Sequence, residues 1–227
     1  MFSIAGIDLL EQELLDNERT LLEILLQDKT TKKNIIWATD DYAELGEPYS
    51  FKKEILPELV TGEQDSPIQP RVEKALEHQT NRTRDKAEVF TPSWICNAQN
   101  NLVDEQWFGR KDVFNIQKEM SWKATADKIA FPDDRQRTWQ KYVDAQRLEI
   151  SCGEAPYLVS RYDTVTGETI PISQRIGLLD RKLRVVSENT TTEEEWFTWT
   201  KRAFQSVYGF EYQGDSLLLA RENLFAN

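Results

Sequence analysis

Apolar residues recur at helical spacing near the start of the chain. Between residues 7 and 28 the leucines fall on one helical stripe, which comprises Leu10, Leu14, Leu21 and Leu25. Such a stripe is typical of an amphipathic helix that packs on the rest of a protein. The pattern therefore predicts a helix over residues 7–28, with a break near Asn17. Binding of a partner protein is the alternative use of the stripe.

The segments that follow, up to residue 70, lack this helical spacing and differ in composition. The run at 34–39 is short, apolar and β-branched, and it predicts a strand that leads into a turn. Six Pro and Gly residues occur from Gly46 to Pro70, which is typical of a loop region. We place a domain boundary there, with an acidic accessory region over 1–70 and a second region over 71–227.

Helical periodicity returns in the second region. It predicts helices near 71–81, 91–104, 138–145, 173–186, 196–207 and 214–223. Thr91 is a suitable N-cap and Pro92 suits the first helical position. Thr192 and Glu195 have the spacing of a capping box.

Two apolar segments near the middle and the end of the chain each lead to an acid. The first ends at Glu149, before a small-residue turn with Cys152 and Gly153, and predicts a strand, a tight turn and the start of a helix. The second runs over 206–211 and ends at Glu211. Strands that alternate with helices predict an α/β fold.

Length and composition are those of an ordinary globular protein. The chain has 227 residues, of which 39% are apolar and 30% are charged. No run of eighteen apolar residues predicts a membrane span, and the first residues lack the pattern of a signal peptide. We therefore expect a cytoplasmic protein without a membrane partner.

The net charge of −11 argues against a phosphate-rich partner at first sight. Residues 1–70 hold 6 basic and 15 acidic residues, whereas residues 71–150 hold 14 and 13. Because the acidity is concentrated in the first region, a local basic surface in the middle of the chain can still bind DNA. The cluster at 82–86 and the aromatic residues that follow it are candidates for such contacts, although core packing is the commoner use of Trp and Phe.

Two cysteines and one histidine limit the chemistry. Cys96, Cys152 and His78 cannot form a zinc site with the usual ligand spacing, nor a disulfide framework. We predict no metal site.

The turn after Glu149 resembles a known motif. Residues 149–158 read Glu-Ile-Ser-Cys-Gly-Glu-Ala-Pro-Tyr-Leu. They are similar to the first motif of amino-methylating DNA methyltransferases, which runs acid, Pro, Ala, Cys, Gly, Ser, Gly, a variable residue, Phe and Leu. Glu149, Cys152 and Gly153 match, and Ala155 stands where the family has a second Gly. Ile150 and Pro156 depart from the pattern.

Two further segments resemble motifs of the same family, in the family order. Phe90, Thr91 and Pro92 resemble the Phe-Thr-Pro segment of adenine methyltransferases, which lies against the methionine end of S-adenosylmethionine. Tyr-Gly-Phe-Glu, ending at Glu211, and the later Ala-Arg-Glu-Asn-Leu resemble the second motif. An acid at this strand end can accept hydrogen bonds from ribose hydroxyls.

The resemblance covers residues 82–227 and is to adenine-specific (N6) DNA methyltransferases of the kind named restriction endonuclease subunit M. It implies a partial Rossmann-like sheet and S-adenosylmethionine as cofactor. The implied cofactor residues are Phe90, Thr91, Pro92, Glu149, Cys152, Gly153, Ala155 and Glu211. The implied function is the cofactor-binding portion of a site-specific DNA methyltransferase in a restriction-modification system.

The catalytic motif of that family does not occur in the chain. The family uses Asn or Asp, Pro, Pro and an aromatic residue to activate the amine and stack on the flipped base, and this sequence contains no Pro-Pro pair. A second protein subunit or a further segment is one source of the motif. The alternative is a non-catalytic DNA-binding or assembly subunit with a remnant cofactor pocket. A nuclease is the third reading, and its one candidate motif, at 180–182, falls in a predicted helix.

Overall fold

The computed structural model describes residues 11–61, 66–74 and 91–227. The chain forms two compact units and alternates between them. Unit 1 comprises residues 1–89, 151–154 and 211–227, and unit 2 comprises residues 90–150 and 155–210. Helices and small sheets occur together, so the fold is mixed α/β.

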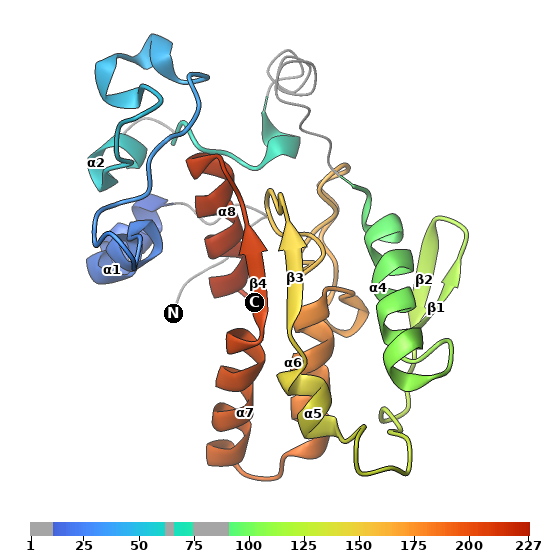
Figure 1. The fold of residues 1–227 in the computed structure, drawn as a ribbon. Coiled ribbons are helices and arrows are strands. Elements are labelled where there is room, and N and C mark those ends of the chain that lie inside the picture. The colour runs from blue at the N-terminus through green and yellow to red at the C-terminus, as the bar shows by residue number, and fades with distance from the viewer. Residues whose placement is uncertain (1–10, 62–65, 75–90) are drawn as a thin grey trace. The chain divides into compact units, whose positions relative to one another are not determined.

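Unit 1 is built from helices and extended loops. Its α-helices are α1 (Glu11–Leu26), α2 (Pro57–Val60) and α8 (Gly214–Phe225), and short 3₁₀ turns lie between α1 and α2 and after α2 (Figure 1). Their core gathers buried side chains, among them Leu14, Leu22, Leu26, Trp37, Ile55 and Leu218. The helix predicted over 7–28 is confirmed over Glu11–Leu26, and the expected break near Asn17 does not occur.

The strand predicted over 34–39 is wrong. Trp37 N–H donates to Lys53 O (3.0 Å) and Ala38 N–H donates to Phe51 O (2.9 Å), but the segment forms only isolated bridges. Ala38 adopts a left-handed conformation with φ of 52°. That residue turns the extended run away from its neighbour, so no continuous ladder can form.

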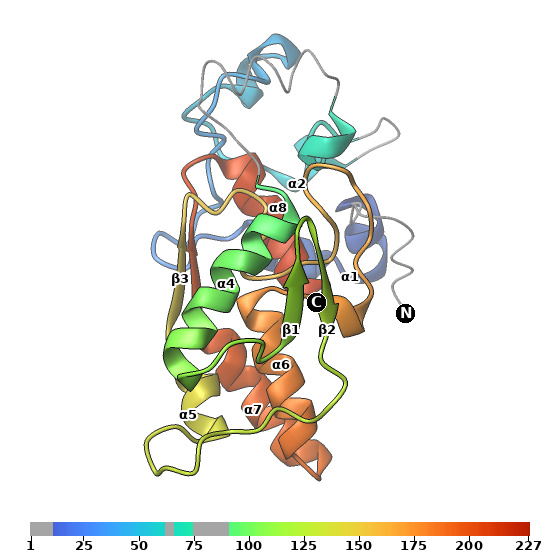
Figure 2. The same cartoon turned by 90° about the vertical axis from the view of Figure 1, so that its right-hand side faces the viewer.

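Unit 2 holds two separate two-stranded sheets. An antiparallel hairpin joins β1 (Asn115–Lys118) to β2 (Ser121–Ala124), and α4 (Ser93–Phe108) lies alongside it (Figure 2). A parallel pair joins β3 (Arg147–Ile150) to β4 (Val207–Phe210). The connection between β3 and β4 contains α6 (Leu178–Asn189) and α7 (Glu193–Gln205), and α5 (Trp139–Asp144) precedes β3.

The parallel pair exposes apolar side chains on one face. Leu148 pairs with Tyr208 and Ile150 pairs with Phe210. These four side chains are 44–72% exposed, whereas sheets of parallel strands are usually covered on both faces.

Local signals placed several elements of unit 2 correctly. The side chain of Thr192 caps α7, as its spacing to Glu195 predicts, and the side chain of Thr138 caps α5. The helix expected from 173 begins only at Leu178, after a 3₁₀ turn at 172–174. The β1–β2 hairpin was not predicted, because its alternation spans only four residues on each strand.

Aromatic residues that were candidates for base stacking form part of the unit 2 core. Phe108, Phe114 and Tyr142 are buried. Their rings pack at centroid distances of 5.3–6.0 Å, with Trp107 and Phe131 at the edge of the same cluster. These five aromatic residues therefore serve packing.

No helix among the described residues is both long enough and apolar enough to cross a membrane.

Candidate cofactor site

The residues implied by the resemblance are distributed over both units. Cys152, Gly153 and Glu211 belong to unit 1, while Thr91, Pro92, Glu149 and Ala155 belong to unit 2. Phe90 lies outside the described residues, as do His78 and the basic cluster at 82–86. We therefore describe each group within its own unit.

In unit 1 the Glu211 carboxylate is held by backbone N–H groups. Its Oε2 accepts a hydrogen bond from Gly153 N (2.7 Å), and its Oε1 accepts from Tyr212 N (2.8 Å) and Gln213 N (3.1 Å). These three bonds fix the orientation of a half-buried carboxylate. A carboxylate offers about four acceptor positions, so Oε2 keeps room for a further donor such as a hydroxyl.

The turn at 151–155 adopts left-handed backbone conformations. Ser151, Gly153 and Ala155 have φ of 53°, 52° and 63°. Left-handed backbone favours Gly and costs other residues about 1 kcal/mol each. The position of Ala155, where the resembled motif has Gly, is thus one that Gly would occupy without strain.

A residue that the sequence reasoning missed anchors this turn in unit 1. Glu154 Oε1 accepts from Arg71 N (2.6 Å), and Glu154 O accepts from Asn223 Nδ2 (3.0 Å). Asn223 is the Asn of the Ala-Arg-Glu-Asn-Leu segment, so the resemblance contained a signal for its position. Cys152 is a buried thiol next to the same turn.

Within unit 2 the segment around Thr91 lies against the residues that follow β3. Tyr157 N donates to Glu149 Oε1 (3.4 Å), and Thr91 O accepts from Cys96 Sγ (3.5 Å) and from Thr164 Oγ1 (3.3 Å). Burial, followed by the nearby charge of Glu149, raises the pKa of the Cys96 thiol to about 12. Burial also raises the pKa of Tyr157, which interacts with Thr91, Cys96 and Glu149. Residues from distant parts of the sequence therefore converge here.

No helix begins after the turn. Residues 156–158 form a turn, and Val159 N donates to Ala155 O (2.9 Å) in a single turn that does not continue. The expectation of a helix start with free N–H groups at this point is wrong. Pro156 lies within this stretch and has no N–H to donate.

The first turn of α4 is capped differently from the sequence prediction. Pro92, and not Thr91, occupies the N-cap position. The Ser93 N–H donates to Asp163 Oδ2 (2.7 Å), a carboxylate from a distant loop. Asp163 Oδ1 also accepts from Val165 N and Thr166 N at 2.9 and 2.8 Å. Burial alone would raise the pKa of the Asp163 carboxyl, but these backbone hydrogen bonds lower it below its usual value.

Replacement of Asp163 by Ala should destabilise the protein by about 1 kcal/mol, because it removes the carboxylate that accepts from the Ser93 N–H at the start of α4. Because the folded-state pKa is lowered, the stabilisation is present near neutral pH and is lost as pH falls through the folded-state value. Urea unfolding of both proteins between pH 6 and pH 3 should show the difference shrinking. A difference that grows toward acid would contradict the assignment.

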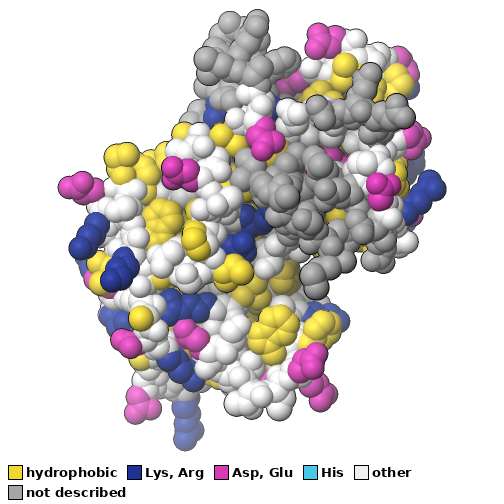
Figure 3. All heavy atoms as spheres, turned by 180° about the vertical axis from the view of Figure 1, so that it is seen from behind, with side chains coloured by type: hydrophobic (Ala, Val, Ile, Leu, Met, Phe, Trp, Pro, Cys, Tyr) yellow, Lys and Arg dark blue, Asp and Glu magenta, His cyan; other side chains and the backbone are white. Residues whose placement is uncertain are grey.

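The described residues contain no group of three or more His, Cys, Asp or Glu side chains placed to hold a metal ion. Over the described part of one face, Lys and Arg side chains are interspersed with Asp and Glu (Figure 3).

Comparisons with known proteins identify no relative. No protein-family model matches the chain, and neither a curated protein nor a solved structure matches it significantly.

Proposed function

We propose that the chain binds S-adenosylmethionine as the cofactor-binding portion of a DNA adenine-N6 methyltransferase. The observation that carries the proposal is the hydrogen bond between Gly153 N and Glu211 Oε2. It joins the glycine of the first resembled motif to the acid of the second, although 58 residues separate them.

The arrangement of strands adds support from unit 2. β3 and β4 are parallel neighbours, and their register pairs Glu149 with Gly209. Nucleotide-like ligands bind beyond the carboxyl ends of parallel strands in α/β sheets. Glu211 follows the end of β4 directly, which is the position of a ribose-binding acid in such sheets.

Each residue then has a defined role. Glu211 accepts hydrogen bonds from the ribose hydroxyls, since its carboxylate is already oriented by three N–H donors. Gly153 permits close approach of the backbone because it has no side chain. By the resemblance, Thr91 and Pro92 lie against the methionine end of the cofactor, and Glu149 is the acid of the first motif. The bound cofactor would supply an electrophilic methyl group.

Methyl transfer to adenine also requires groups that activate the amine and stack on the flipped base. The sequence has no Pro-Pro pair of the kind the family uses. A second subunit or further segment would supply these groups. The exposed apolar face of β3 and β4 favours this view, because additional sheet or helix packing would cover it. A non-catalytic subunit with a remnant pocket is the second candidate, favoured by Pro156 and by the missing helix after the turn.

Calorimetric titration with S-adenosylmethionine tests the proposal. We expect wild-type protein to bind, and Glu211→Ala to bind about 10- to 100-fold more weakly, because a hydrogen bond to a charged group contributes about 1.5–3 kcal/mol. Glu44→Ala, which removes an exposed acid of unit 1, is the matched control and should bind like the wild type.

An analogue without the two ribose hydroxyls separates a ribose contact from a structural effect. Wild type should lose about as much affinity for it as Glu211→Ala loses for the parent compound, and the two losses should not add. Additive losses would place Glu211 away from the ribose. Absence of binding by folded wild-type protein would overturn the cofactor proposal itself.

A further inference from the structure

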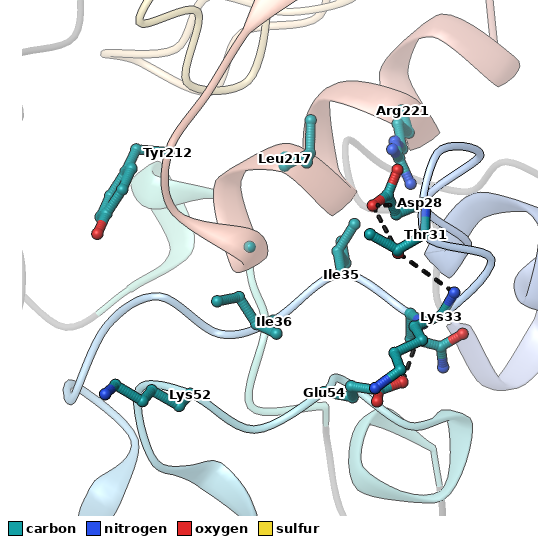
Figure 4. A pocket seen from close by; sticks show the side chains of 12 residues that line it. Asp28, Thr31, Lys33, Ile35, Ile36, Lys52, Glu54, Tyr212, Leu217 and Arg221 are labelled. Atoms are coloured by element: carbon teal, nitrogen blue, oxygen red, sulfur yellow. Dashed lines mark hydrogen bonds between the residues drawn. The ribbon is translucent and has the colours of Figure 1, made fainter.

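A separate pocket of about 510 Å³ lies wholly within unit 1 (Figure 4). Residues 28–36, Lys52, Glu54 and the first half of α8 contribute to its walls. Small-molecule sites commonly have volumes of about 300–1,000 Å³. None of the eight candidate cofactor residues lines this pocket, so it needs an explanation of its own.

The middle of the pocket is apolar. Figure 4 shows Ile35, Ile36 and Leu217 between two polar ends, with Tyr212 at one of them. Ile36 is 41% exposed although it faces this space. The Tyr212 ring packs on Phe51 at a centroid distance of 6.3 Å, which gives the pocket an aromatic wall. An apolar body can therefore bury its surface here.

The acidic side chains of the lining are already engaged by the protein. Asp28 accepts hydrogen bonds from Thr30 N (2.9 Å), Thr31 N (3.3 Å) and Thr31 Oγ1 (2.6 Å), and Glu54 accepts from Asn34 N (3.0 Å). The Thr31 hydroxyl, with the backbone donors, lowers the pKa of Asp28. These carboxylates serve to shape the loop rather than to receive a cation.

The basic side chains of the lining differ in their partners. Arg221 donates to Leu25 O and Gln27 O at 2.5 and 3.2 Å, which fixes it against the end of α1. Lys33 and Lys52 are exposed, and within the described part of the chain their ammonium groups form no ion pair. Two ammonium groups are thus free to receive an anion at the rim of an apolar pocket.

We propose that this pocket binds a small organic anion with an apolar body, such as an aryl carboxylate, sulfonate or monophosphate. The apolar body lies on Ile36 and Leu217 against Tyr212, and the anionic group is attracted by Lys52 on the Tyr212 side of the pocket, while Lys33 adds a longer-range attraction from the opposite side (Figure 4). S-adenosylmethionine has the opposite charge, because its sulfonium and ammonium outweigh one carboxylate. The proposal goes beyond the cofactor assignment and does not depend on it.

Fluorescence titration with 8-anilinonaphthalene-1-sulfonate, an aryl sulfonate, provides the test on the full chain. Lys33→Glu combined with Lys52→Glu should weaken binding at least about 10-fold, since two attractive charges that line the pocket become repulsive to an anion. Lys29→Glu combined with Lys123→Glu makes the same change in net charge at exposed positions outside the pocket. This control should lose clearly less affinity than the Lys33/Lys52 variant, because neither Lys29 nor Lys123 lines the pocket and solvent screens exposed charges that do not contact the anion.

A second variant tests the apolar part of the pocket. Ile36→Trp adds volume at a half-exposed position of the floor, so it should also weaken binding of the probe while leaving both lysines in place. Unchanged affinity in the lysine pair variant, or equal loss in its control, would overturn the proposal. Failure of S-adenosylmethionine to bind would not contradict the anion-binding proposal, because the two tests use different ligands and different variants.

Discussion

Replacement of Arg181 by Met should lower the free energy of unfolding by about 3–5 kcal/mol, the cost of leaving one member of a buried ion pair without its partner. Arg181 and Asp104 are almost completely buried in unit 2, and their closest nitrogen and oxygen atoms are 2.5 Å apart. The same guanidinium donates to Asn97 Oδ1 (2.8 Å) and Asn101 Oδ1 (2.9 Å), and Asp104 also accepts from Tyr142 OH (2.9 Å). Loss of the Arg181 guanidinium would leave several buried acceptors unsatisfied.

An exposed ion pair of the same chemistry provides the control. Arg202 forms two hydrogen bonds to Asp144, but both side chains are substantially exposed. Arg202→Met should cost about 1 kcal/mol or less, because solvent screens such pairs. Urea unfolding followed by tryptophan fluorescence would measure both variants. Equal losses for Arg181→Met and Arg202→Met would refute the importance assigned to the buried network.

Replacement of Lys182 by Met should lower the free energy of unfolding by about 2–4 kcal/mol near pH 9, the second largest expected loss. The reason is that buried hydrogen-bond acceptors would lose their donor. Lys182 is fully buried. Its Nζ lies within hydrogen-bonding distance of Val143 O (2.9 Å), Ala145 O and Ser206 Oγ. It thereby joins α6 to the end of α5 and to the residue before β4, so it supports the strands on which the candidate site depends.

The effect should depend on pH in a defined direction. Burial, assisted by the charge of Arg147, lowers the pKa of Lys182 to about 7 from 10.5. Between these values the unfolded chain binds more protons than the folded chain, so the wild-type unfolding free energy rises with pH. The advantage of wild type over Lys182→Met is therefore greatest above about pH 10 and shrinks as pH falls toward 7.

Unfolding free energies of wild type and Lys182→Met at pH 7, 8 and 9 provide the measurement. Lys123→Met, at an exposed position of β2, should retain the wild-type pH slope. A wild-type advantage that decreases toward alkaline pH would show that Lys182 is buried in its charged form.

Local sequence signals were sufficient to predict a helix or strand where nearby residues set its ends and its buried face. The caps at Thr138 and Thr192 act within their own helices, at three-residue spacing. The stripe that includes Leu14 and Leu25 correctly indicated the buried face of α1. β3 and β4 were also located, because each has an apolar run that ends near an acid and a turn.

Local signals failed where a partner distant in the sequence decides the outcome. The strand expected over 34–39 lacks a continuous partner and is interrupted at Ala38. Asp163, 70 residues from Ser93, caps α4 in place of Thr91. The hydrogen bond between Gly153 and Glu211 was not predicted, since the resemblance only made both residues candidates for cofactor binding, and it depends on the return of the chain to unit 1 after β4.

The sequence by itself determined the alternation of strands and helices, most helix boundaries and the small-residue turn after Glu149, because these depend on side-chain periodicity and on backbone preferences within a few residues. Tertiary structure alone decided which polar side chains are buried and what they bind. Arg181 and Lys182 follow one another in a helix whose sequence looks amphipathic, yet both are buried with acceptors from distant segments. Burial makes such partners necessary, since an unpaired charge in the interior is costly. The positions of those partners are set by packing across the chain.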